Sequence, residues 1–345
     1  MKRLPLVSVL ALVAVVLAAC TGGTPRTTAA NASTTGTPRA LRDITFMAGF
    51  KPQANLAFVA AYVAQDKGYF ADEGLRVAIK HAAGQDEHLK LLLAKEIQFT
   101  TATGAQAVLR YADNLPVRAV ALWGQRGDQG YVARADSGIK GPADFKGHTV
   151  GIKSGVVPAE LQAMLAGAGL SQSDVKLQGV GFDPRVFVQG AVDIYPVFLS
   201  NEPYAIRKTG TNITVFDPAD YGVSTLGLTY LAHADTVRDD PALVRAFDRA
   251  TIRGAQFAID HPDEAVQITL KYAEGADPGQ QRYLLDTDIA AAKRTDGIGR
   301  ANASQWQALQ TTLTKYGVLT KPVDANAAWY GAAVDSLYDA QGKLK

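Results

Sequence analysis

The 345-residue sequence contains a single cysteine, Cys20, so no disulfide can form within the chain. After the first twenty residues there is no apolar run long enough to span a bilayer, which argues against a channel. Neither basic nor acidic residues are in excess. Without Lys2 and Arg3, 33 basic residues stand against 33 acidic residues, and no basic stripe is present. This balance argues against a nucleic acid as partner.

Familiar enzyme signatures are missing as well. The sequence contains neither a G-x-x-x-x-G-K-[ST] phosphate loop nor an H-E-x-x-H zinc motif. Gly179 and Gly181 begin like a dinucleotide fingerprint, but Pro184 occupies the place of the third glycine. The five histidines are scattered, and the lone cysteine lies near the N-terminus, so we expect no metal site and no thiolate nucleophile. The sequence therefore predicts no cofactor and does not favour an enzyme.

The N-terminal residues predict export and attachment to a membrane. In residues 1–19, Lys2 and Arg3 precede a short apolar segment that ends in small residues, as in a secretory signal peptide. The segment Leu17-Ala18-Ala19-Cys20 resembles a bacterial lipobox, in which the cysteine takes up lipid after cleavage. Residues 20–42 are rich in Thr, Ala, Gly and Pro and should form a flexible tether. We expect a protein anchored through Cys20 to the outer face of the cell membrane.

The remaining residues, roughly 300, are more than one small core requires. Apolar β-type segments alternate with helical patterns: 44–50 and 75–82 read as strands, and 58–70 reads as a helix. Such alternation predicts mostly parallel sheets flanked by helices. A second unit of the same kind covers about 137–222.

These patterns predict an α/β protein with two lobes. Lobe 1 is expected to comprise residues 43–135 and 224–345, and lobe 2 residues 136–223. The chain would cross between the lobes twice, near 133–138 and 222–228, which forms a hinge beside a cleft. Ligands of such sheets bind at the carboxyl ends of strands.

Three segments carry a resemblance to a known family. "AYVAQDKGYFADEGL" (61–75), "DFKGHTVGI" (144–152) and "LSNEPYA" (199–205) resemble ABC-importer binding proteins of the THI5-like/NMT1 (SsuA/THI5) group. "GFKPQANL" (49–56) and "GFDPRVF" (181–187) look closest to its riboflavin-binding branch. The resemblance implies a type II periplasmic-binding-protein fold without a cofactor.

It also implies a function and partners. A small ring-containing solute would be delivered to a membrane permease that is powered by an ATPase. Riboflavin is the first expectation, and a thiamine pyrimidine precursor is the alternative. The pyrimidine branch more often has a tryptophan where this chain has Phe50. A eukaryotic relative is an enzyme with a cysteine-rich run that this chain does not have, which leaves an enzyme as a remote alternative.

A flat heterocycle needs apolar faces above and below it and polar groups at its rim. Candidates for these roles follow expected strands or open expected helices. The predicted ligand-binding residues are Phe50, Asn55, Thr101, Thr103, Trp123, Ser154, Gly155, Tyr195, Asn201, Glu202 and Tyr204.

Each of these candidates also has a structural interpretation. Glu202 stands at the start of an expected helix, where the helix dipole stabilises a carboxylate, and it could equally accept a hydrogen bond from a ligand. Trp123, Phe50 and Tyr195 could be core residues. The two threonines could simply end a strand. Glu202 is the only obvious base for the enzyme alternative.

Overall fold

Two five-stranded sheets organise the described part of the chain, which comprises residues 40–83, 86–153 and 155–345 of a computed structural model. The expected signal peptide, most of the tether with Cys20, and Ser154 lie outside these residues. Within the described ranges, every helix is too short or too polar to pass through a bilayer.

The first sheet has the order β2-β1-β3-β10-β4. Its strands are β1 (Arg42–Ala48), β2 (Leu75–His81), β3 (Phe99–Thr103), β4 (Val117–Leu122) and β10 (Leu228–His233). β1 pairs in parallel with β2 and β3, whereas β10 runs antiparallel between β3 and β4. All five residues of β3 are buried, as expected for a central strand that is covered on both faces.

The second sheet repeats this plan with the order β7-β6-β8-β5-β9. Its strands are β5 (Gln129–Arg134), β6 (Thr149–Ile152), β7 (Lys176–Gly179), β8 (Ile194–Phe198) and β9 (Ile213–Phe216). β6 is parallel to β7 and β8, and β5 is antiparallel to β8 and β9. Tyr131 and Val132 of β5 pack into different cores, because successive strand residues point to opposite faces.

The first crossing between the sheets comes earlier than the sequence predicts. A lobe boundary after residue 135 assigns β5 to lobe 1, but its ladders with β8 and β9 place it in the second sheet. The crossing therefore runs through residues 123–128 instead of 133–138. β5 follows β4 without an intervening helix, so the strand–helix alternation gives no sign that the sheet has changed. We call the first sheet with its helices the first lobe, and the second sheet with its helices the second lobe.

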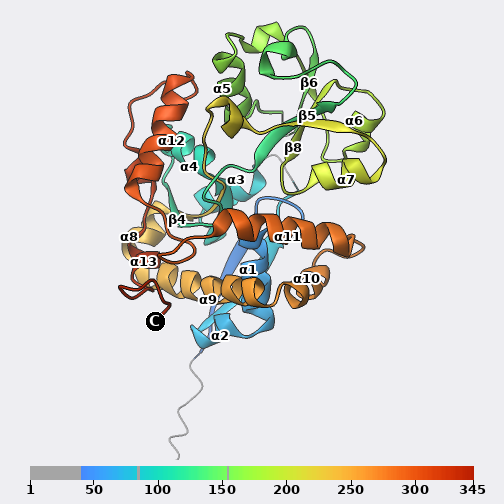
Figure 1. The fold of residues 1–345 in the computed structure, drawn as a ribbon. Coiled ribbons are helices and arrows are strands. Elements are labelled where there is room, and N and C mark those ends of the chain that lie inside the picture. Colours follow the sequence, from blue (N-terminus) through green and yellow to red (C-terminus); the bar gives the residue numbers. More distant parts are fainter. Residues whose placement is uncertain (1–39, 84–85, 154) are drawn as a thin grey trace, which may run out of the picture. The chain divides into compact units, whose positions relative to one another are not determined.

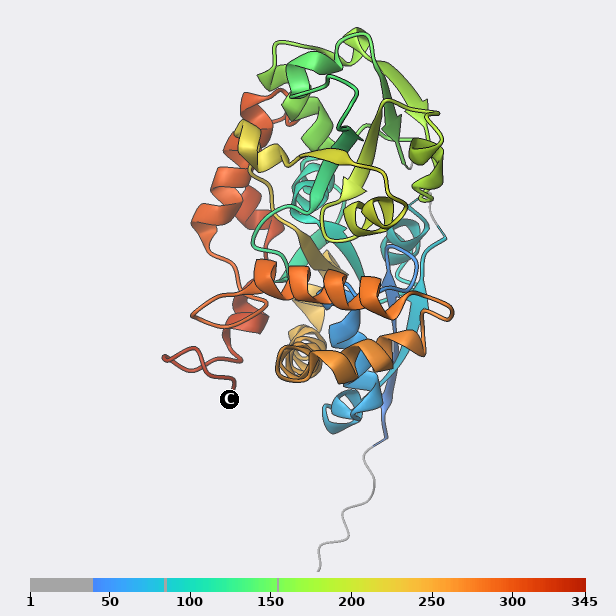
Figure 2. The ribbon, with the colours of Figure 1, turned by 45° about the vertical axis from the view of Figure 1, so that its right-hand side comes forward.

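Helices cover both faces of the first sheet. They are α1 (Leu56–Asp66), α2 (Tyr69–Asp72), α3 (Glu87–Leu93), α4 (Gly104–Ala112), α8 (Ala234–Asp239), α9 (Pro241–Asp260), α10 (Pro262–Leu270), α11 (Pro278–Ala292), α12 (Ala303–Lys315) and α13 (Ala332–Asp335). Figures 1 and 2 show α9 packed against α1. Phe247 of α9 also stacks on Phe99 of β3, with ring centroids 4.0 Å apart. Asp240 caps α9 through the Leu243 N–H, and Pro241 suits its first turn.

Three helices belong to the second sheet: α5 (Ala159–Gly167), α6 (Arg185–Val188) and α7 (Glu202–Lys208). The chain's C-terminal part also reaches this lobe. Tyr316 and Val318, which follow α12, pack against the core that contains Phe145 and Val150. The first lobe therefore holds the second through the two crossings and through α12.

Candidate functional site

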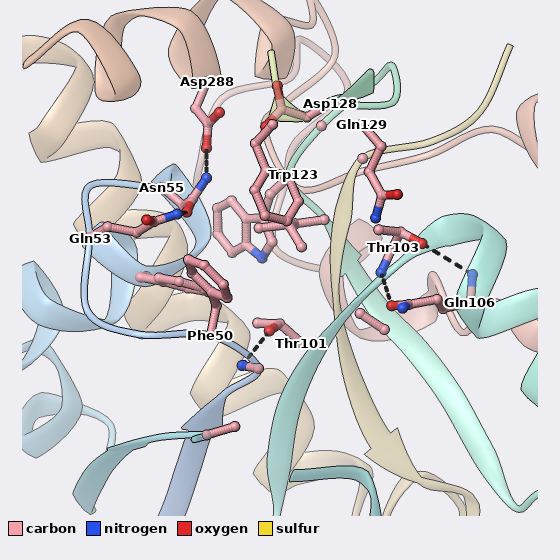
Figure 3. A pocket seen from close by; sticks show the side chains of 18 of the residues that line it. Phe50, Gln53, Asn55, Thr101, Thr103, Gln106, Trp123, Asp128, Gln129 and Asp288 are labelled. Atoms are coloured by element: carbon pink, nitrogen blue, oxygen red, sulfur yellow. Dashed lines mark hydrogen bonds between the residues drawn. The ribbon is translucent and has the colours of Figure 1, made fainter. Parts of the chain in front are cut away.

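A pocket of about 260 Å³ opens between the two lobes. Its walls include the carboxyl ends of β3 and β4, the loop after β1, the first crossing, and α11. The residues that line it include Phe50, Lys51, Gln53, Asn55, Asp86, His88, Thr101, Thr103, Gln106, Trp123, Arg126, Asp128, Gln129, Phe182, Phe198 and Asp288. Figure 3 shows most of these side chains around a common space.

Aromatic rings from both lobes form the apolar part of the pocket. Phe50, in the loop after β1, meets Phe182 and Phe198 of the second lobe edge-on, at centroid distances of 4.7 and 5.7 Å. Trp123 is 2% exposed and packs edge-on against Tyr230 at 4.9 Å. Its indole N–H has no partner among the described residues, so a hydrogen-bond donor remains available at the pocket wall.

Polar side chains of the first lobe surround the ends of the strands. The Thr101 hydroxyl accepts a hydrogen bond from the Gly49 N–H at 2.9 Å, which fixes the loop before Phe50. Thr103 caps α4 by accepting from the Gln106 N–H at 3.2 Å, and the Gln106 side chain accepts from the Thr103 N–H at 3.1 Å. Figure 3 shows both threonines beside the pocket.

A buried histidine adds a neutral polar group to this end. Burial, together with the nearby Arg110 guanidinium, lowers the pKa of His88 to about 4, so its ring is uncharged at pH 7. Asp86 forms an ion pair with Arg110 at 3.0 Å, and the charge of this carboxylate is thereby compensated.

Two further carboxyl groups line the pocket: Asp128 at the end of the first crossing and Asp288 on α11. Asp128 accepts bonds from the Ser200 N–H at 3.0 Å and the Ser200 hydroxyl at 2.6 Å. Asp288, on α11, accepts from the Leu56 N–H at 2.9 Å and from the Asn55 amide at 3.0 Å. Burial raises the pKa of Asp288 to about 6. Burial also raises the pKa of Asp128, and the charge of Asp288 raises it further.

Five of the residues predicted from the sequence line this pocket: Phe50, Asn55, Thr101, Thr103 and Trp123. They come together because the carboxyl ends of β1, β3 and β4 meet at one edge of the first sheet. Gly155 is exposed, and α5 begins four residues after it, so this glycine does not open the helix as expected.

The candidates of the second lobe lie elsewhere among the described residues. Tyr195 is fully buried, and its hydroxyl donates to the Gly181 carbonyl at 3.1 Å. Tyr204 stacks on Tyr283 of α11, with ring centroids 5.3 Å apart. Asn201 joins the lobes by donating to the Gln53 side chain at 3.2 Å and accepting from Gln280 at 2.6 Å.

The position of Glu202 corrects the sequence-based expectation of a ligand contact. Its carboxylate forms an ion pair with Lys153 and accepts from the Phe198 N–H at 2.7 Å. The side chains of both ionic partners are almost buried, with 11% of Lys153 and 4% of Glu202 exposed. The Lys153 ammonium lies 5.1 Å from the Phe198 ring centroid. Glu202 therefore supports the aromatic wall from behind and is not among the lining residues.

Sequence reasoning missed several lining residues, including Asp128, Asp288, Phe182 and Phe198. Phe198 ends β8, so the strand-end position that predicts Thr101 and Trp123 could also have predicted this residue. Asp288 lies inside α11, more than 200 residues from the loop it binds, and the local sequence gives no signal for it.

Two α/β lobes with a solute-sized pocket between them define a periplasmic-binding-protein fold. The family model described as NMT1/THI5 like matches residues 55–265, and the chain belongs to this family. It is accordingly a substrate-binding protein of the SsuA/THI5 type. Proteins of this type serve import systems, which implies a small-molecule ligand and a membrane permease.

Similar proteins differ in what they are named for. The riboflavin-binding protein RibY of Chloroflexus aurantiacus is 28% identical over 95% of this chain and 97% of its own length. A formylaminopyrimidine-binding protein of Halalkalibacterium halodurans is 26% identical over 86% of this chain and 92% of its own. The structure of the aliphatic sulphonate binding protein SsuA from Escherichia coli has a TM-score of 0.63 and 17% identity. It covers 85% of this chain and 92% of that one, and it shows the fold alone.

Proposed function

We propose that this protein captures riboflavin in the pocket between its lobes and delivers it to the permease of an ATPase-driven importer. The observation that carries the proposal is the combination of Phe50, Phe182, Phe198 and Trp123 around one cavity. Aromatic side chains favour a flat ring system by offset or edge-on packing. The cavity volume of about 260 Å³ lies just below the range for small-molecule sites, roughly 300–1,000 Å³.

Polar groups at the rim supply orientation. The indole N–H of Trp123 can donate to a ring carbonyl, and the side chains of Thr103 and Gln129 offer further donors and acceptors. The near full-length similarity to a protein named for riboflavin supports this ligand over the pyrimidine alternative. We also propose that Cys20 carries a lipid that holds the protein at the outer face of the membrane.

The proposal makes Trp123 central to ligand binding. Trp123→Ala should weaken riboflavin binding by about 2 kcal/mol, or roughly 30-fold, because a buried aromatic anchor and its N–H are both lost. Titration of riboflavin fluorescence measures the dissociation constant. The matched control is Trp329→Ala, which alters a tryptophan of the first lobe that packs on Trp306 and does not line the pocket. Equal losses in both variants, or no loss in Trp123→Ala, would contradict the assignment.

A formylaminopyrimidine is the second candidate, because a near full-length relative is named for it. Competition with bound riboflavin separates the two ligands: tighter binding of the pyrimidine would reverse the order proposed here. We also propose that the ligand is released unaltered. Glu202, the only base suggested by the sequence for an enzyme, is occupied by Lys153 and the Phe198 N–H. Chromatography of riboflavin recovered after prolonged incubation should therefore show no product.

A further inference from the structure

Asp128 and Asp288 bring two carboxyl groups to one pocket from distant parts of the chain. Asp128 lies in the first crossing, directly before β5, and Asp288 lies on α11 of the first lobe. Both residues line the same pocket, and the charge of Asp288 adds to the effect of burial in raising the pKa of Asp128. Figure 3 shows the two side chains in the same part of the pocket, near Trp123 and Asn55.

Each carboxyl group is held rigidly by its own surroundings. Ser200 donates twice to Asp128, and the Leu56 N–H and Asn55 amide both donate to Asp288. Asp288, with a pKa of about 6, is mostly ionised at pH 7 and retains free acceptor sites after these bonds are formed. Burial and the charge of Asp288 favour the protonated form of Asp128, which keeps acceptor capacity and carries one O–H donor. The pair therefore presents hydrogen-bond acceptors in fixed positions, with the negative charge on Asp288.

Nearby cations do not neutralise the pair. Two cationic residues line the pocket, Lys51 and Arg126, and neither forms an ion pair with Asp128 or Asp288 among the described residues. Arg126 lies 4.0 Å from Asp217, and Lys51 is exposed. This part of the pocket consequently attracts hydrogen-bond donors and repels anions.

We propose that Asp128 and Asp288 determine specificity by accepting hydrogen bonds from hydroxyl groups of the ligand and by excluding a phosphate or sulfonate at the same position. The inference rests on the proposed function, because the hydroxyl groups would be those of the ribityl chain of riboflavin. Riboflavin 5′-phosphate then becomes the discriminating probe. It has the same ring and differs in carrying an anion at the end of that chain.

The test compares riboflavin and riboflavin 5′-phosphate by fluorescence titration of the full chain. The wild type should bind riboflavin at least roughly 100-fold more tightly, since an unpaired like charge is a strong means of rejecting a competitor. Asp288→Asn should reduce this ratio roughly 10-fold, because it keeps the shape and removes the charge, whereas Asp128→Asn replaces a group that favours its neutral form and should change the ratio less. Asp286→Asn is the matched control: it lies on the same helix, is exposed and binds Arg282.

The outcomes separate the two proposals. Equal binding of both compounds by the wild type overturns the inference and leaves riboflavin capture intact. An unchanged ratio in Asp288→Asn overturns it as well. If the protein binds no riboflavin, the proposed function fails, and the inference fails with it. Circular dichroism shows whether each variant folds. If a variant does not fold, the comparison of the two compounds on the wild type decides whether the inference stands.

Discussion

The buried ion pair of Lys153 and Glu202 provides a sharp test of how the second lobe is built. Glu202→Ala removes the partner of an ammonium group whose side chain is only 11% exposed, and it removes the acceptor of the Phe198 N–H. Breaking a buried pair on one side costs about 3–5 kcal/mol. The residual exposure of Lys153 gives the ammonium some contact with water, so we expect a loss of about 3 kcal/mol in the free energy of unfolding.

Urea unfolding followed by circular dichroism measures this loss. Glu264→Ala is the matched control, because it breaks an exposed pair with Lys67 and should leave the free energy of unfolding nearly unchanged. A Lys153→Met, Glu202→Gln double variant should regain most of the stability, since both charges disappear together and the glutamine oxygen can still accept from Phe198. The reasoning is refuted if Glu202→Ala keeps full stability yet loses riboflavin binding more than about 10-fold. That result would make Glu202 a direct ligand contact.

Two further predictions concern the core and the N-terminus. Asp248 is fully buried, its oxygens have no partner among the described residues, and burial raises its pKa, so the folded state retains a proton that the unfolded chain loses above about pH 4. Stability should therefore fall as pH rises from there, and Asp248→Asn should raise the free energy of unfolding at pH 7 by about 1–3 kcal/mol, with exposed Asp260→Asn as control. Cys20→Ser should shift the protein from the membrane fraction to the soluble fraction of the cells that export it; retention at the membrane would refute the proposed lipid anchor.

The architecture was accessible from the sequence because it rests on local patterns. Strand–helix alternation around 44–50, 58–70 and 75–82 reflects side-chain periodicity, and the structure has β1, α1 and β2 there. The predicted strand ends indicated Phe50, Thr101 and Trp123, because the carboxyl ends of parallel strands in one sheet converge at one edge. Strand–helix alternation predicts the wrong lobe boundary at β5, because this strand joins the second sheet without a helix before it.

The remainder of the site depends on tertiary contacts that have no local signature. Asp288 reaches the pocket from the middle of α11, and Asp128 is held by Ser200, which is 72 residues away. Glu202 was an apparent ligand residue because the start of a helix suits a carboxylate in either role. Glu202 has the structural role because it pairs with Lys153. The position of Lys153 relative to Glu202 follows only from the packing of β6 beside β8.

The most direct test of riboflavin capture is a crystal structure of the protein grown with riboflavin. If riboflavin is the ligand, density for a flat three-ring system should lie between the lobes, in contact with Phe50 and Trp123 and with the polyol chain near Asp128 and Asp288. A structure with riboflavin present in excess and this pocket empty, or with the ring bound outside it, would contradict the account.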